Sequence, residues 1–275
     1  MNKNEVLRQR TVTGLIYGIV VIGLIYSGKW GMILLTALVA AGASVEYIRM
    51  VHPESVPKKV VTVSLTTLCI LLLLALPPHS VWYFRLLIVS ASMLVIGIAN
   101  LYSGFINHSK YYHVVSVFYL GMPLGLLISY VWHSDPYLPA LWMGMLALIW
   151  MSDSFAYLIG SRIGRTKLFE RISPKKSWEG FLGAGLLTLG LGAAVGKYWL
   201  ADTVSRDALL FWGLMAGIAW CIGTMGDLVE SSVKRTFGVK DSGNILPGHG
   251  GFLDRFDSFI YILPFVLLLI LKFNQ

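Results

Sequence analysis

Carboxylate, hydroxyl and lysine side chains recur at helical spacing near the C-terminal end of the 275-residue chain. Glu230, Ser231 and Lys234 follow Asp227 at offsets of three, four and seven residues, so a helix carries all four on one face. This face is either an ordinary solvated surface with a Glu230 to Lys234 pair, or part of a binding site. Because the stripe follows directly from an apolar segment and begins with a carboxylate, we favour the binding site.

A glycine-rich turn follows over residues 240–251 and leads into Asp254, Arg255 and Asp257. Glycine permits close approach of the backbone to a ligand, and the start of a helix offers unpaired N–H donors to phosphate. Helix capping explains Asp254 and Asp257 equally well. Together with the preceding face, the carboxylates, basic side chains and glycines form the inventory of a metal and phosphate site, because Mg²⁺ takes one or two protein carboxylates and substrate phosphate.

A basic loop over residues 161–177 carries six lysine or arginine residues and a single acid, Glu170. Composition alone favours an anchor on anionic lipid headgroups. At the end of the loop, however, Pro174 and Ser177 suit the start of a helix, which attracts phosphate.

Asp153 lies inside an apolar segment, and Tyr157 follows one helical turn later. A charge near the bilayer centre costs about 2.5–3.5 kcal/mol, so such an acid needs a partner or a cavity. The alternatives are a structural pair with a neighbouring helix and a functional role, and we favour the latter.

These groups must be positioned by membrane-spanning helices. Hydrophobic residues make up 56% of the chain and charged residues 13%, about half the usual charged fraction of a soluble domain. The apolar runs are continuous, which is typical of spanning helices and not of a barrel. We predict an all-α, polytopic bundle with nine spans: Val12–Tyr26, Trp30–Ile48, Val60–Leu76, Val81–Tyr102, Val114–Trp132, Leu138–Gly160, Trp178–Trp199, Ala208–Leu228 and Phe252–Leu271.

The nine spans leave no room for a separate soluble domain. We expect a single membrane-embedded domain over residues 1–275, with N-terminal helices in 1–137 and catalytic helices and cytoplasmic loops in 138–275. The seventh span is rich in small residues, which serve either a dimer contact or internal packing. They are Gly180, Gly183, Gly185, Gly190, Gly192 and Gly196.

Basic residues set the expected orientation. If the spans alternate from an N-terminus inside, 17 of the 22 lysine and arginine residues lie on the inner side. Eleven of the 14 acidic residues lie there too, although acids contribute little to orientation. We therefore expect the N-terminus and the chemistry to face the cytoplasm, with the C-terminus outside.

The C-terminal motifs resemble a known family. Residues 231–235, 240–243 and 246–257 resemble the signature of the phosphatidate cytidylyltransferases, also called CDP-diacylglycerol synthases. Residues 153–157 and 173–180 are similar to shorter motifs of that family. The resemblance covers the last 125 residues, whereas the first 140 contribute only helices.

The resemblance implies a dimeric, all-helical enzyme of the plasma membrane, without a nucleic-acid partner. It implies that CTP reacts with phosphatidic acid to give CDP-diacylglycerol and pyrophosphate, with Mg²⁺ as the cofactor. It also allows a monovalent cation such as K⁺ at the same site. Asp227 and Asp254 match the family's metal ligands, and Asp153 and Glu230 are further candidates for metal or supporting roles.

We assign the remaining roles from the resemblance and the chemistry together. The catalytic groups are Asp227, Asp254, Lys234, Arg235 and Arg255. The substrate-binding groups are Lys175, Lys176, Ser177, Glu179, Lys240, Asp241, His249, Gly250, Gly251, Asp257 and Tyr157.

Two other functions use similar features. An ion-coupled transporter also contains intramembrane acids, but it predicts acids deep in several spans and inverted repeats, and Asp153 is the one strong candidate here. A related CTP-using lipid kinase or cytidylyltransferase shares the inner-face chemistry, and physical reasoning does not separate it from the family above.

Overall fold

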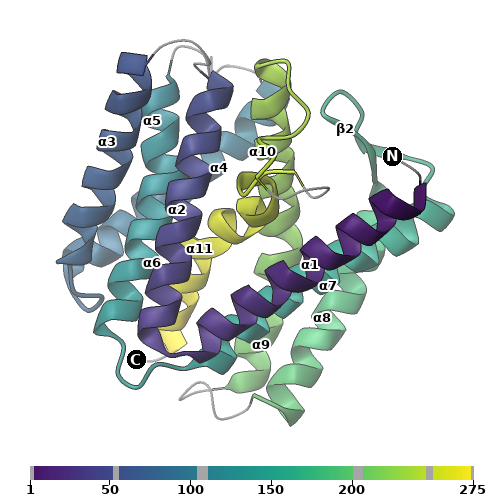
Figure 1. Ribbon diagram of the computed structural model, residues 1–275. Helices are drawn as coiled ribbons and strands as arrows, with labels where there is room; N and C mark the ends of the chain where they lie inside the picture. The colour runs from purple at the N-terminus through teal and green to yellow at the C-terminus, as the bar shows by residue number, and fades with distance from the viewer. Residues whose placement is uncertain (1–2, 52–55, 104–110, 201–206, 246–249, 274–275) are drawn as a thin grey trace. The chain divides into compact units, whose positions relative to one another are not determined.

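The computed structural model describes residues 3–51, 56–103, 111–200, 207–245 and 250–273. Helices dominate these residues, as the sequence predicts (Figure 1). The chain divides into two compact units that alternate along the sequence. Unit 1 comprises Met1–Leu86, Gly104–Tyr137 and Val233–Asp257, and unit 2 comprises Leu87–Ser103, Leu138–Ser232 and Ser258–Gln275.

Unit 1 is built around helices that pack along α2. Within the unit α2 contacts α1, α3 and α6, and a π-helical turn joins α5 to α6. The Tyr83 hydroxyl donates to the Leu126 carbonyl at 2.7 Å, which satisfies both groups inside the apolar interior. The helices are α1 (Lys3–Tyr26), α2 (Lys29–Val51), α3 (Val56–Leu74), α5 (Tyr112–Ser116), η1 (Val117–Gly121) and α6 (Met122–His133).

Unit 2 is built around α7 and α8, which pack closely against each other, and α8 also contacts α9. Three helices have residues in both units. Helices α4 and α11 begin in unit 1 and end in unit 2, whereas α10 begins in unit 2 and ends in unit 1. The elements are α4 (Val81–Ser103), α7 (Pro139–Ile163), β1 (Lys167–Phe169), β2 (Ser173–Ser177), α8 (Trp178–Tyr198), α9 (Ala208–Gly217), η3 (Ile218–Ile222), α10 (Gly223–Thr236) and α11 (Leu253–Phe273).

Eight helices in the described residues are long and apolar enough to cross a membrane, and they coincide with eight of the nine predicted spans. The remaining span, Val12–Tyr26, is helical, but the apolar stretch that contains it, Thr11–Tyr26, is shorter than each of the other eight helices. That stretch reaches roughly 24 Å along the axis at 1.5 Å per residue. It is shorter than the hydrocarbon core of about 30 Å.

The glycines of α8 pack inside unit 2. A Cβ on Gly185 would lie 2.4 Å from the Trp220 ring, and one on Gly192 would lie 2.6 Å from the Trp212 carbonyl oxygen. Gly180, Gly183 and Gly196 are equally close to neighbouring atoms, whereas Gly190 faces open space. Of the two predicted uses, internal packing is therefore the one observed at five of the six positions.

A two-stranded antiparallel hairpin departs from the all-α prediction. Strand β2 pairs with β1, with Lys167 opposite Ser177, so Pro174 lies within a strand and not at a helix start as predicted. The prediction for Ser177 is confirmed, because its Oγ accepts the N–H of Gly180 at 3.2 Å and caps α8. Such a cap stabilises a helix by about 1 kcal/mol.

Candidate active site

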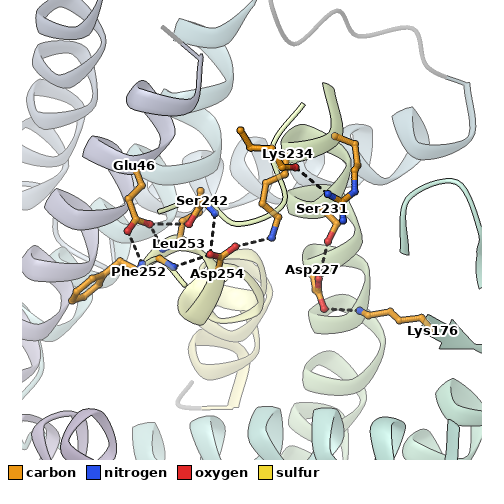
Figure 2. A network of polar contacts seen from close by, with 12 residues as sticks. Glu46, Lys176, Asp227, Ser231, Lys234, Ser242, Phe252, Leu253 and Asp254 are labelled. Carbon is orange, nitrogen blue, oxygen red and sulfur yellow. Dashed lines mark hydrogen bonds and ion pairs between the residues drawn. The ribbon is translucent and has the colours of Figure 1, made fainter. Parts of the chain in front are cut away.

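Polar side chains of the C-terminal motif form two networks, one in each unit, which Figure 2 shows at close range. One network surrounds Asp254 in unit 1, and the other surrounds Asp227 in unit 2. Each contains a lysine paired with the aspartate. The predicted catalytic residues Lys234 and Asp254 are thus in contact, as are the predicted residues Lys176 and Asp227.

The network in unit 1 holds Asp254 by both carboxylate oxygens. Lys234 Nζ lies 2.6 Å from Oδ1, while Oδ2 accepts the N–H groups of Ser242 and Gly251 at 2.9 and 2.8 Å (Figure 2). The side chains of the ion pair are 10% and 5% exposed. Burying two charges is costly, and the additional backbone hydrogen bonds offset part of that cost. Asp254 therefore has a fixed position.

Glu46, in the C-terminal half of α2, supports the same network. Its Oε1 accepts the N–H of Phe252 at 2.9 Å, and its Oε2 accepts the Ser242 hydroxyl and the N–H of Leu253 at 2.8 and 2.9 Å (Figure 2). The residue is 1% exposed. Its carboxylate thus satisfies N–H groups at the start of α11, where the helix dipole favours negative charge.

The sequence prediction gave Glu46 no role. A usable signal existed, because Glu46 is an acid inside the predicted span Trp30–Ile48. The rule that selected Asp153, that an ionisable residue within a span requires a partner, applies equally to Glu46.

Three glycines in the described part of residues 240–251 lie against these two carboxylates. A Cβ on Gly243 would lie 2.5 Å from Glu46 Oε1, and a Cβ on Gly251 would lie 2.3 Å from Glu46 Oε2. Gly250 has a φ of +84°, a left-handed conformation that favours glycine, and its Cβ would lie 2.8 Å from Asp254 Oδ2. These glycines approach protein carboxylates closely. The predicted approach to a ligand stays a prediction.

The network in unit 2 brings β2 to α10. Lys176 Nζ lies 2.7 Å from Asp227 Oδ2, and the Ser231 hydroxyl donates to Asp227 Oδ1 at 3.2 Å (Figure 2). The side chains of Lys176 and Asp227 are 24% and 32% exposed. This ion pair is more accessible than the pair in unit 1.

Glu230 follows Asp227 on the same face of α10 and is 1% exposed. The two residues offer carboxylate oxygens within 4.8 Å of each other. Mg²⁺ binds through one or two carboxylates and completes its octahedron with water and phosphate. This donor set is therefore suitable for a divalent cation, and the buried position of Glu230 argues against an ordinary solvated face.

Two predicted site residues, the substrate-binding Glu179 and the catalytic Arg235, have structural contacts. Glu179 accepts the N–H groups of Arg165 and Thr166 at 3.0–3.2 Å, which fastens the start of the hairpin to α8. Arg235 donates to the Val239 carbonyl at 3.0 Å near the end of α10. The predicted residues Lys175, Lys240, Asp241 and Arg255 are exposed, Asp257 is half-buried, and His249 lies outside the described residues.

Asp153 and Tyr157 both lie on the exposed side of α7, with Tyr157 74% exposed. Their participation in a site stays a prediction.

These observations define a polytopic helical membrane protein with carboxylate and lysine networks at the ends of its spanning helices. Residues 8–273 match the model of the "Cytidylyltransferase family". The chain belongs to that family, which confirms the resemblance seen in its motifs.

Named relatives cover almost the whole chain. The chain is 34% identical over 288 residues to the phosphatidate cytidylyltransferase of Bacillus subtilis (strain 168), with 98% of this chain and 99% of the relative aligned. It is 32% identical over 273 residues to the phosphatidate cytidylyltransferase of Staphylococcus aureus (strain COL), with 97% and 100% aligned.

Proposed function

We propose that the chain is a phosphatidate cytidylyltransferase, which transfers the cytidylyl group of CTP to phosphatidic acid and releases CDP-diacylglycerol and pyrophosphate. The observation that carries this proposal is the similarity to proteins of that name along 97–98% of the chain. The paired lysines and carboxylates of the motif support it, because they suit a reaction between two phosphates.

The reaction requires no protein nucleophile. A phosphate monoester has a second pKa near 6, so phosphatidic acid presents an anionic oxygen at neutral pH. That oxygen attacks the α-phosphorus of CTP, a new P–O bond forms, and the bond to the β-phosphate oxygen breaks as pyrophosphate leaves. The protein must bring two anions together and stabilise the departing charge.

Lys176 and Lys234 are the groups that we assign to that electrostatic work. Each ammonium is held 2.6–2.7 Å from an aspartate, so its position is fixed before substrate binds. An ammonium offers three donors, and Lys176 Nζ also donates to the Thr224 carbonyl at 3.5 Å. We propose that both ammonium groups bind phosphate oxygens, in charge-assisted hydrogen bonds that are about twice as strong as neutral ones.

Asp227 and Glu230 are the residues that would hold a divalent cation, which we propose is Mg²⁺. When bound, Mg²⁺ neutralises charge on the phosphates and orients them. Asp254 remains a proposed third ligand, although three donors occupy its oxygens. A carboxylate has about four acceptor sites, so roughly one is left. The proposal also allows a monovalent cation such as K⁺.

An apolar cavity of about 420 Å³ in unit 1 suits a lipid chain, and its volume falls within the range of about 300–1,000 Å³ typical of ligand pockets. It is lined by residues of α1, α2 and the start of α11, among them Val21, Leu38 and Phe256. We place one acyl chain of phosphatidic acid there, because Phe252 and Phe256 line the cavity and flank Asp254 in sequence.

Filling the cavity tests this placement. Leu38→Trp should lower kcat/KM for long-chain phosphatidic acid more than for a short-chain form, whereas KM for CTP should stay unchanged. Leu34→Trp on the exposed side of α2 is the matched control, because Leu34 does not line the cavity. Equal losses for both chain lengths would refute the placement.

The location and assembly follow from the same proposal. Phosphatidic acid lies in the membrane and CTP in the cytosol, so we propose a multi-pass plasma-membrane protein whose N-terminus and site face the cytoplasm and whose C-terminus lies outside. We also propose a homodimer. Labelling of single introduced cysteines with an impermeant thiol reagent tests the orientation, and light scattering of the purified protein tests the dimer.

The central experiment uses purified protein in detergent with phosphatidic acid, radiolabelled CTP and Mg²⁺. We expect label from the cytidine ring in the lipid phase and release of pyrophosphate. Lipid phosphorylation with CDP as the second product would instead indicate a CTP-dependent lipid kinase. Absence of any CTP turnover would overturn the proposed function.

A further inference from the structure

We propose that Glu46 is a positioning residue for the reaction. Glu46, Ser242, Phe252 and Leu253 form what we call the Glu46 clamp. The inference rests on the proposed function for its catalytic meaning, whereas the clamp itself is a geometric feature of unit 1. Helix α2 thereby contributes to a motif that lies 196 residues away in sequence.

The clamp uses both oxygens of the carboxylate. Oε1 accepts one backbone N–H and Oε2 accepts one backbone N–H and one hydroxyl, all at 2.8–2.9 Å. Four N–H groups at the start of any helix lack intrahelical partners. Glu46 satisfies two of them, at Phe252 and Leu253, and therefore fixes where α11 begins.

The clamp reaches Asp254 through Ser242. The Ser242 hydroxyl donates to Glu46, while the Ser242 N–H donates to Asp254 Oδ2. Asp254 follows Leu253 directly, and it pairs with Lys234 at 2.6 Å. Loss of the clamp should therefore shift Asp254 and Lys234 together, although Glu46 contacts neither residue in the hydrogen bonds described above.

Two glycines fit this carboxylate closely. A methyl group added at Gly243 would lie 2.5 Å from a Glu46 oxygen, and one added at Gly251 would lie 2.3 Å from the other. Real Cβ contacts are not this short, so an alanine at either position would displace the Glu46 carboxylate, and an alanine at Gly251 would also displace the Ser242 hydroxyl, 2.2 Å away. Gly243 and Gly251 therefore both lie directly against the side chain of Glu46.

Glutamine is the informative substitution because it has the same shape. In Glu46→Gln an NH₂ group replaces one oxygen and acts as a donor. At the position of Oε1 it faces the N–H of Phe252, and at the position of Oε2 it faces the N–H of Leu253. Both orientations place donor against donor, so packing is preserved while the clamp is broken.

The first test compares turnover and amide hydrogen exchange in full-length wild type and Glu46→Gln. We expect kcat to fall by about 10²-fold, the loss that a misplacement of 1 Å can cause. Exchange should accelerate in peptides that contain Ser242 and residues 251–254, and stay unchanged in α6 and α8. Thr36→Ala is the control, since buried Thr36 lies on α2 and bonds to its own helix at Met32.

The second test asks whether Gly243 is needed because of Glu46. Gly243→Ala should lower kcat at least tenfold in the wild type and less than twofold in a Glu46→Ala background, because the obstructing carboxylate is then absent. Such non-additivity reports a direct interaction. If Gly243→Ala lowered kcat equally in both backgrounds, glycine would be needed there for contact with a ligand and not with Glu46. That result would remove this support for the clamp.

The outcomes separate the inference from the proposed function. Wild-type kcat in Glu46→Gln would overturn the inference alone. A lowered unfolding temperature with faster exchange throughout unit 1 would overturn it too, because the role would then be structural. If the wild type makes no cytidine-containing lipid, the proposed function fails, and the exchange data still decide whether the clamp exists.

Discussion

The two aspartate networks differ in how firmly each carboxylate is held. In unit 1, Asp254 accepts one lysine and two backbone donors and its side chain is 5% exposed. In unit 2, the side chain of Asp227 is 32% exposed and lies beside Lys176 and Ser231. The difference indicates that Asp254 organises its helix start, whereas Asp227 is accessible to ions and phosphate.

Asp254→Asn should have the largest effect, because it combines a catalytic loss with a structural one. Removing one partner of a buried ion pair costs about 3–5 kcal/mol. We expect CTP-dependent turnover to be nearly abolished and the unfolding temperature in detergent to fall. Asp254→Asn combined with Lys234→Met should recover stability without activity. A single variant as stable as the wild type would contradict the organising role of Asp254.

Asp227→Asn should abolish turnover almost as completely while leaving stability nearly unchanged. An exposed ion pair contributes about 0.2–1 kcal/mol, so we expect normal membrane insertion and an unfolding temperature close to that of the wild type. Turnover and thermal unfolding measured on the same preparation give the comparison with Asp254→Asn. Wild-type turnover would refute the assignment of Asp227 to the cation.

Lys176→Met should have an intermediate effect. A hydrogen bond to a charged group contributes about 1.5–3 kcal/mol, so loss of one phosphate contact should raise KM for CTP roughly tenfold or more. Lys167→Met provides the charge control, because Lys167 is exposed on the other strand of the hairpin. Matching changes in the two variants would show that only the net charge of the hairpin matters.

Ser231→Ala should have the smallest effect. It removes a hydroxyl that donates to the Asp227 carboxylate at 3.2 Å. A hydrogen bond to a charged group contributes about 1.5–3 kcal/mol, and the length of this one favours the lower end, so kcat/KM should fall about tenfold. Ser231→Thr retains the hydroxyl and should stay near the wild type. A loss as large as that of Asp227→Asn would mean that Ser231 acts on substrate directly.

The helices and the motif were predictable from sequence because each depends on local patterns. Eight apolar runs match eight observed helices, and the offsets from Asp227 to Lys234 match a single helix, α10. The hairpin was missed because its polar, basic strands lack the alternation of a half-buried strand. Pro174 and Ser177 together indicated a helix start, and only Ser177 occupies one.

The partners within the site were less predictable. Lys234 lies against Asp254, 20 residues further on, and the spacing on α10 does not predict this contact. Lys176 and Asp227 are 51 residues apart in the sequence, and no local period links them. Long-range pairs of this kind depend on how helices pack, which a periodic pattern does not encode.

The reach of Glu46 has a consequence for engineering. A hybrid enzyme that takes its N-terminal half from a distant relative would keep the length of its hydrophobic helices. It would still lose the carboxylate that accepts the N–H groups at the start of α11, unless the new half has an acid at the position of Glu46. The early helices should therefore be treated as part of the catalytic scaffold during gene shuffling, and not as an interchangeable anchor.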